Sequence, residues 1–390
     1  MHDVIRDMAL WLACENRKKK KKFVVKDGVG LIRAQEVEKW KETQRISLWD
    51  TSIKELGEPP YFTNTVTFLA LGKCIRSFSN GFFTRMPVMR VLDLSNHYEC
   101  IKLPTEIGNL VTLQYLNLSG TRTKYLPVEL KNLKKLRCLI LDYMHSLEPL
   151  PPQMVSMFSS LQLFSMYESQ YKGDERRLLE ELEQLEHNDD ISIDLTSVSS
   201  TQTLFNSHRL QRTTRRLRLL DCKSMNLELV VYSKFLRHQC LNNLSDVKIF
   251  VYYKLLNLTW LIYAPSLQFL WVQFCKSMKK VVDDERSEVL EIEVDHLGVF
   301  SRLIFLTLIC LPKQRSIHER ALLFPSLRHI TLFDCPSLRK LPFDSNTGIS
   351  KKLEKIRGEK EWWDGLEWED QTIMRNLTPY FQPTQILKKI

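Results

Sequence analysis

The sequence predicts an α/β solenoid, a fold in which short repeating units stack and share one parallel sheet. Two observations predict it. An apolar frame recurs, as in Leu110-x-x-Leu113-x-x-Leu116-x-Leu118 and the next unit, Leu133-x-x-Leu136-x-x-Leu139-x-Leu141. The last two positions of this frame recur from Ile46/Leu48 to Ile330/Leu332, with a mean spacing of about 26 residues. A fixed period of this length indicates a repeat array rather than separate globular domains.

Each part of the frame predicts an element of local structure. The final L-x-L alternates with period two, which predicts a short strand with its apolar side chains on one face. The upstream leucines at three-residue steps suit a tight helical or 3₁₀ approach to that strand. One unit cannot bury its apolar face alone, so neighbouring units must stack. The predicted strand pairs are Ile46/Leu48, Leu69/Leu71, Leu92/Leu94, Leu116/Leu118, Leu139/Leu141, Phe164/Met166, Ile191/Ile193, Leu217/Leu219, Val247/Ile249, Leu270/Val272, Leu306/Leu308 and Ile330/Leu332.

The spacing falls in the leucine-rich-repeat range of about 20–29 residues, which predicts a horseshoe with a parallel concave sheet. Leu103-Pro104 and Leu126-Pro127 recur between strands, where the proline is expected to fix a turn on the convex side. Asp174–Asp190 is acidic and carries leucines at helical spacing, which predicts a longer convex helix.

Three cysteines occupy one slot of the repeat. Cys222, Cys275 and Cys335 each lie three residues after the second apolar position of a strand. A small side chain there satisfies backbone groups of the next turn, so we interpret these cysteines as structural.

The alternate residues of each strand are expected to face solvent on the concave side. They are mixed in charge and include several aromatic residues, a composition that suits protein recognition. The alternative is that they are only solvated strand positions. The partner-binding candidates among them are Trp49, Tyr115, Arg137, Arg218, Lys248, Trp271 and Arg328, and Asp142 is another residue expected to face solvent.

Composition narrows the class of protein. Of 390 residues, 44% are apolar and 26% are charged, which excludes a wholly disordered chain. The formal net charge is +10, but half of this excess lies in residues 1–45. The nine cysteines form no CxxC pair, and no run of about 18 apolar residues occurs. We therefore expect no metal site, no specific nucleic-acid binding and a cytoplasmic protein. Peripheral association with the plasma membrane is an alternative that the sequence does not support.

The two ends differ from the repeats. Residues 3–12 carry an apolar stripe at helical spacing, with Asp3 as an N-cap. The basic run Arg17–Lys22 follows; nuclear import, an anionic surface contact and a solvated linker are alternative interpretations. At the other end, Trp362 and Leu366 are spaced as on one helix face, which predicts a cap over the last repeat.

The segment Met1-His2-Asp3, followed by Val-Ile-Arg-Asp-Met-Ala-Leu-Trp, resembles the MHD motif of plant NB-LRR (NLR) disease-resistance proteins, and most closely the coiled-coil class. The repeat Leu92-Asp93-Leu94-Ser95 and the tail Glu361-Trp362-Trp363 are also similar to that family. The resemblance covers nearly the whole chain and implies the C-terminal portion of such a receptor.

The resemblance implies specific roles and boundaries. In that family the motif belongs to the winged-helix part of the NB-ARC switch, and its histidine contacts the β-phosphate of ADP. His2 would then contact nucleotide, with Asp3 as its partner, only if the NB-ARC module were present. No G-x-x-x-x-G-K-[ST] sequence occurs, so we expect no cofactor for this chain alone, and ADP or ATP in the intact receptor. The expected domains are a winged-helix remnant and linker over 1–25, about twelve repeats over 26–342, and a cap over 343–390.

The function that the resemblance implies is recognition and regulation in defence. The repeats of such a receptor sense a pathogen effector or a guarded host protein, and they contact the NB-ARC module to restrain its ADP/ATP switch. The alternative is a generic leucine-rich adaptor, such as a signalling scaffold or a ubiquitin-ligase substrate receptor. An enzyme is not expected, because no G-x-S-x-G, H-E-x-x-H or paired metal motif occurs.

Overall fold

The computed structural model describes residues 23–27, 42–49, 55–56, 61–71, 75–100, 102–220, 241–283, 300–318, 324–343 and 352–384. His2, Asp3, Arg17–Lys22 and Cys222 lie outside these ranges, as does the expected winged-helix remnant before residue 23. The chain divides into two compact units, Met1–Asp190 and Ile191–Ile390.

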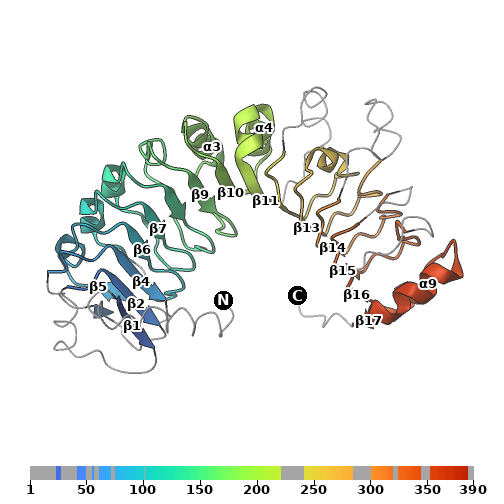
Figure 1. The fold of residues 1–390 in the computed structure, drawn as a ribbon. Helices are drawn as coiled ribbons and strands as arrows, with labels where there is room; N and C mark the ends of the chain where they lie inside the picture. The colour runs from blue at the N-terminus through green and yellow to red at the C-terminus, as the bar shows by residue number, and fades with distance from the viewer. Residues whose placement is uncertain are drawn as a thin grey trace. The chain divides into compact units, whose positions relative to one another are not determined.

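The first unit is a ladder of parallel strands that pair in chain order (Figure 1). A separate pair, β3 (Glu55–Leu56) and β5 (Ser77–Phe78), lies beside it. The strands of the ladder are β1 (Phe23–Asp27), β2 (Arg45–Trp49), β4 (Thr67–Leu71), β6 (Val91–Asp93), β7 (Tyr115–Asn117), β8 (Cys138–Ile140) and β9 (Leu163–Met166). The side opposite the strands carries η2 (Phe83–Arg85), η3 (Thr105–Asn109), η4 (Val128–Asn132) and α3 (Glu175–Glu183).

The second unit repeats this plan with longer strands. Its parallel ladder consists of β10 (Asp190–Leu195), β11 (Thr214–Leu220), β12 (Asp246–Phe250), β13 (Phe269–Gln273), β14 (Phe305–Ile309), β15 (His329–Phe333), β16 (Lys355–Gly358) and β17 (Phe381–Pro383). Its helices are α4 (Val198–Asn206), α5 (His208–Thr213), η5 (Thr259–Tyr263), α8 (Lys360–Asp364), α9 (Gln371–Leu377) and η7 (Thr378–Tyr380). Strand β1 and strands β16 and β17 lie outside the range of strand pairs expected from the sequence.

The predicted inward positions form the core. Leu92, Leu116 and Leu139 are fully buried and align across β6, β7 and β8. The expected prolines also fit, because Pro104 and Pro127 directly precede η3 and η4, and the backbone of Pro104 is extended. The solenoid with parallel strands is therefore confirmed within each unit.

One strand register differs from the sequence prediction. Strand β4 buries Phe68 and Ala70, whereas Leu69 is only half-buried, so the expected inward pair Leu69/Leu71 is wrong by one residue. Phe68 aligns with Ile46 of β2, and its ring packs edge-on against Phe82 at 5.9 Å between centroids. Phe68 and Leu69 are both apolar, so alternation alone could not choose between them.

Backbone carbonyls that precede the strands link the repeats. The Arg90 carbonyl accepts hydrogen bonds from the N–H groups of both Gln114 and Tyr115, and the Gln114 carbonyl accepts from both Arg137 and Cys138. The same arrangement recurs in the second unit, where the Gln268 carbonyl accepts from two successive N–H groups. Each repeat is thus bound to the next at the entrance to its strand by atoms that every residue type except proline supplies.

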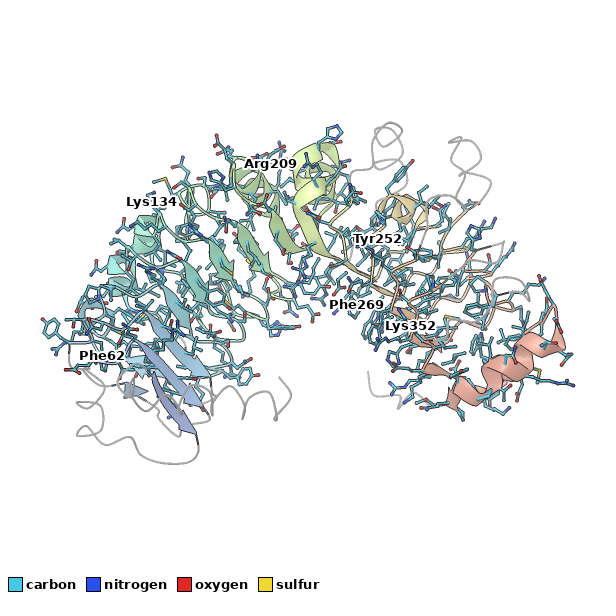
Figure 2. The ribbon with its side chains drawn as sticks, viewed as in Figure 1. Phe62, Lys134, Arg209, Tyr252, Phe269 and Lys352 are labelled. Atoms are coloured by element: carbon cyan, nitrogen blue, oxygen red, sulfur yellow. The ribbon has the colours of Figure 1, made fainter. Side chains whose placement is uncertain are left out.

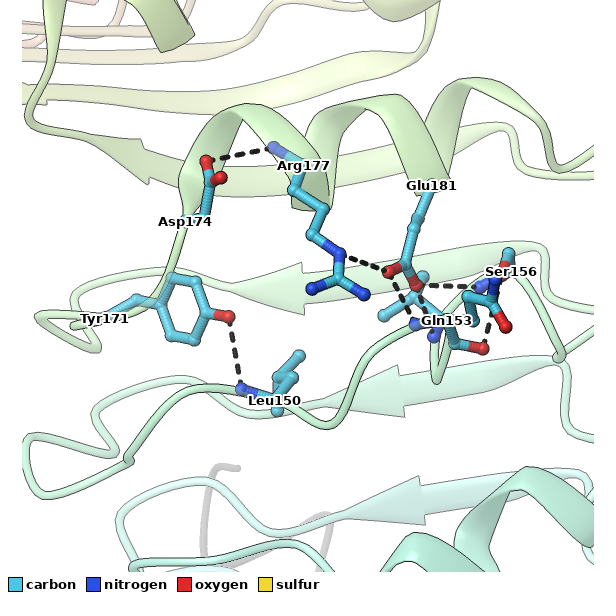
Figure 3. Close-up of polar contacts among 8 residues, drawn as sticks. Leu150, Gln153, Ser156, Tyr171, Asp174, Arg177 and Glu181 are labelled. Carbon is cyan, nitrogen blue, oxygen red and sulfur yellow. Dashed lines mark hydrogen bonds and ion pairs between the residues drawn. The ribbon is translucent and has the colours of Figure 1, made fainter.

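The acidic segment predicted as a helix forms α3, and its side chains Leu178, Leu179 and Leu182 are buried. The Asp174 carboxylate accepts a hydrogen bond from the N–H of Arg177 and caps the helix. Figure 3 shows Glu181 of α3 reaching the preceding loop, where its carboxylate accepts from the N–H of Gln153 at 2.8 Å and of Ser156 at 3.2 Å. The helix is therefore tied to the loop by a charge-assisted contact.

Two of the slot cysteines are described, and both are part of the core. Cys275 and Cys335 are buried, and the Cys335 thiol lies 3.3 Å from the Phe333 carbonyl. Burial raises the pKa of each thiol to about 12, which keeps both uncharged and poorly nucleophilic. This environment agrees with the structural role expected from their position in the repeat.

His97 couples the first unit to pH. Its Nε2 donates to the Ala70 carbonyl at 2.8 Å and its Nδ1 accepts from the Ile75 N–H at 3.3 Å, so the folded state holds a neutral ring. Burial lowers the pKa of His97 below its ordinary value of 6.5. The unfolded chain therefore takes up the proton first as pH falls, and stability declines from about pH 6.5 down to the folded pKa.

We therefore expect His97→Gln to flatten this decline. The parent should lose up to about 1.4 kcal/mol of unfolding free energy per pH unit from this group below pH 6.5. Urea unfolding of the parent and of His97→Gln at pH 7.0 and 5.5 measures the difference. Equal pH slopes for the two proteins would show that His97 does not supply the dependence.

Candidate functional site

The outward side chains of the second unit bring together predicted candidates from neighbouring strands. Arg218, Lys248 and Trp271 align across β11, β12 and β13. We call the surface formed by these side chains, with those of Phe250, Phe269, Phe305 and His329, the aromatic sheet face. Figure 2 shows Phe269 on the strand side of the second unit, whereas Tyr252 lies in the interior.

One row of this face consists of stacked rings. Phe269 and Phe305 lie 5.0 Å apart between ring centroids with planes 11° apart, and Phe305 lies 4.6 Å from the His329 ring. The parallel ladder places these three residues directly opposite one another, which explains the stacking. Phe269 and Phe305 nevertheless remain 38% and 37% exposed. Aromatic side chains held in place yet open to solvent are typical of protein-binding surfaces.

Cations pack over the neighbouring aromatic rings. The Arg218 guanidinium carbon lies 5.1 Å from the Phe250 centroid, and Lys248 Nζ lies 5.8 Å from the Trp271 centroid. Trp271 is 37% exposed, and its Nε1 donates to Gln273 Oε1 at 3.1 Å. These contacts restrict the side chains before any partner arrives, which reduces the entropy lost on binding.

A buried carboxylate orients Arg218. Asp194 of β10 is only 3% exposed, and its Oδ2 lies 3.3 Å from Arg218 Nη1. The pair neutralises the arginine charge locally and holds the guanidinium over Phe250.

The candidates in the first unit are more dispersed. Tyr115 is half-buried beside Asp93, and burial, followed by that carboxylate, raises the pKa of the phenol to about 12. Asn117 Nδ2 donates to Asp93 Oδ2 at 3.0 Å, so this face is polar and internally hydrogen-bonded. The backbone of Trp49 ends β2, and its side chain lies outside the described atoms.

Two candidates do not occupy the expected strand positions. Arg137 and Arg328 are exposed, but each lies one residue before its strand, β8 or β15. The carbonyl of each accepts two N–H groups from the next repeat, so both side chains leave at the edge of the sheet. Arg328 Nη1 lies 3.4 Å from Glu354 Oε1.

Asp142 also departs from the prediction that it faces solvent. It is buried, and its Oδ1 accepts from the Ser165 hydroxyl and from the N–H of Tyr167 at 3.0 Å. The alternation that predicted exposure ends with β8 at Ile140, so it no longer governs Asp142. A buried carboxylate there satisfies groups of the next repeat.

The sequence reasoning missed four residues of the aromatic sheet face: Phe250, Phe269, Phe305 and His329. A usable signal was present, because Phe269, Phe305 and His329 each directly precede the first inward residue of a strand. Tyr115, which directly precedes Leu116, occupies the same position of its strand and is among the predicted candidates.

Within the described ranges, no group of three or more His, Cys, Asp or Glu side chains could hold a metal ion. No helix in the same ranges is long and apolar enough to cross a membrane. The chemistry on this face is that of contact: stacking, cation–π attraction and hydrogen bonding.

A family description, "Leucine-rich repeat region", matches residues 62–378. The chain belongs to the leucine-rich repeat family. It is 33% identical over 413 aligned positions to the disease resistance protein RPS5 of Arabidopsis thaliana, covering 97% of this chain and 45% of the relative. It is 30% identical to the Arabidopsis disease resistance protein UNI, covering 98% of this chain and 46% of the relative.

The leucine-rich repeat chain thus spans about half the length of these relatives. The resemblance to plant disease-resistance proteins expected from the sequence is confirmed over nearly the whole of this chain. Among solved structures, it is similar to the functional domain of InlJ from Listeria monocytogenes, with 14% identity, a TM-score of 0.49, and coverage of 83% of this chain and 64% of that one.

Proposed function

We propose that this chain is the recognition and regulatory region of an intracellular plant immune receptor, and that it binds its partner on the aromatic sheet face. The relatives are named as disease resistance proteins, and the leucine-rich repeat fold presents a sheet face typical of interaction modules. The observation that carries the proposal is the exposed set Phe269, Trp271 and Phe305, which lies on adjacent strands.

The partner in this proposal is a pathogen effector or a host protein that an effector modifies. Apolar rings flanked by Lys248 fit a protein segment that offers apolar side chains and a carboxylate. In an intact receptor, the repeats would also contact the NB-ARC module and restrain its ADP/ATP switch. His2 would contact that nucleotide and Asp3 would support it. The proposed location is the cytoplasm, and neither catalysis nor a cofactor of the chain itself is part of the proposal.

A direct binding screen tests this assignment. The purified chain is titrated against a panel of effectors and the host proteins that they modify. We expect a binder whose affinity falls about tenfold or more in Trp271→Ala and in Phe305→Ala, as for interface anchors worth over about 1.4 kcal/mol. Tyr125→Ala is the matched control, because Tyr125 is 68% exposed but belongs to a loop of the first unit.

The outcome separates the two classes of function. A binder from the panel that is insensitive to both sheet-face substitutions would contradict the proposed surface. A chain that binds only ubiquitin-ligase or scaffold components would instead favour the adaptor, for which the described residues offer no specific observation.

A further inference from the structure

A hollow in the first unit is lined by different residues from those of the aromatic sheet face and has a distinct chemistry. Its volume is about 830 Å³, within the range of about 300–1,000 Å³ that is typical of small-ligand sites. The residues that line it are Asn96, Tyr98, Gly120, Thr121, Arg122, Lys124, Tyr143, His145 and Ser146. They follow β6, β7 and β8, so three successive repeats build it.

The backbone of the hollow is held by the repeat ladder. Beyond the strands, the Asn96 N–H donates to the Ser119 carbonyl, Gly120 donates to Asp142, and Tyr143 donates to Tyr167, at 2.7–3.0 Å. Asn96, Gly120 and Tyr143 share a left-handed φ of 59–67°, so the loops of the three repeats turn at equivalent points. The hollow is therefore a regular product of the stacking of repeats.

Buried and exposed side chains alternate over residues 121–124, which places the cations Arg122 and Lys124 on the same, solvent-exposed side. Thr121 and Thr123 are buried, with their hydroxyl oxygens 3.3 Å apart, and Thr123 donates to the Cys100 carbonyl. Arg122 and Lys124, which alternate with them, are exposed. Within the described part of the chain, neither Arg122, Lys124 nor His145 forms an ion pair, and no described lining residue is acidic. The nearby acids Glu99 and Glu148 are engaged by Arg76 and Lys172.

Two aromatic rings complete the lining. Tyr98 and Tyr143 are each 47% exposed, although both belong to the wall of the hollow. A guanidinium and an ammonium together favour a tetrahedral oxyanion, which the guanidinium binds through paired donors. Exposed tyrosine rings favour a planar apolar group beside that anion.

We propose that this hollow binds an aryl phosphate, with the phosphate on Arg122 and Lys124 and the ring against Tyr98 and Tyr143. His145 and Asn96 supply further polar groups for the phosphate oxygens or the ring substituents. The ligand is either a free small molecule or a phosphorylated tyrosine side chain of a partner protein. The site is independent of the aromatic sheet face and of the partner assigned to it.

Calorimetric titration of the full chain with phenyl phosphate tests the proposal. We expect binding that weakens at least about tenfold in the double variant Arg122→Gln/Lys124→Gln, as for the loss of charge-assisted hydrogen bonds. Lys102→Gln/Lys135→Gln is the matched control, because it removes two exposed charges of the same unit outside the hollow. It should bind as the parent does, and all three proteins should share one melting curve, since the substituted side chains are exposed.

Further probes separate the contribution of the phosphate from that of the aromatic ring. Phenol and inorganic phosphate should each bind at least about tenfold more weakly than phenyl phosphate, because each lacks one of the two contacts. A tyrosine-phosphorylated peptide that binds more tightly than phenyl phosphate would assign the ligand to a protein partner, and equal binding would assign it to a free molecule. Absence of phenyl phosphate binding at millimolar concentration, equal binding of inorganic phosphate, or equal weakening in the control variant would overturn the proposal.

Discussion

Leu116→Asp is expected to unfold the first unit at temperatures where the parent remains folded. Leu116 has no exposed surface and aligns between Leu92 and Leu139, so the new carboxylate would lie among apolar side chains of three repeats. An unpaired buried charge costs several kcal/mol, and the loss of leucine packing adds about 2–5 kcal/mol. Domains are stable by only about 5–15 kcal/mol, so this single change consumes much of that margin.

Far-UV circular dichroism during thermal and urea unfolding measures the effect. Val111→Asp is the matched control, because Val111 lies in the same repeat but is 53% exposed and should accept a carboxylate with little loss. Because repeats stabilise their neighbours, the damage is expected to extend beyond one unit of the ladder. A parent-like melting curve for Leu116→Asp would refute the register assigned to β7.

Trp362→Ala is expected to destabilise the end of the second unit by about 3–5 kcal/mol, as for other buried tryptophans. Trp362 of α8 is 9% exposed, and its Nε1 donates to the Leu338 carbonyl at 3.0 Å. Its ring lies so close to Gly358 of β16 that a Cβ there would be 2.8 Å from ring atom Cε3. The ring thus covers the backbone of the ladder as well as its side chains.

Two further variants define the cause. Trp362→Phe keeps most of the ring but leaves the Leu338 carbonyl without its donor, so it should cost about 1–3 kcal/mol. Glu361→Ala changes an exposed neighbour on the same helix and should be nearly silent. Urea unfolding followed by tryptophan fluorescence and circular dichroism ranks the three. If the urea midpoint of Trp362→Ala equals that of Glu361→Ala, the segment that contains Trp362 does not cap the repeats.

The spacing of apolar residues was sufficient to predict the ladder, because most repeats bury two apolar residues of one parity, as Leu116 and Leu118 are buried. It failed where two apolar residues are adjacent, as at Phe68 and Leu69, and where the strand had already ended, as at Asp142. The apolar spacing also missed β16, because the next residue of the same parity after Ile356 is Gly358 rather than a second large apolar residue.

The site was harder to predict than the fold. Outward parity identified Arg218, Lys248 and Trp271, which do lie together. It could not show that Asp194 pairs with Arg218, since these residues are far apart in sequence and meet only through strand pairing. The hollow beside Arg122 depends on turns with left-handed backbone in three repeats; Asn96 and Gly120 carried a sequence signal for such a turn, whereas Tyr143 did not.

The paired hydrogen bonds to carbonyls before each strand have a consequence for how such a chain can change. The links between repeats are made by peptide groups, whereas the register follows from the buried positions, which need only be apolar and of suitable size. Loop length between strands is therefore loosely constrained, as the 36 residues from Leu270 to Leu306 show beside the 23 from Leu116 to Leu139. The peptide groups and inward side chains of a strand determine the fold, whereas its outward side chains determine recognition. New specificity can then arise by exchanging outward side chains one at a time, with little cost to the stability of the array.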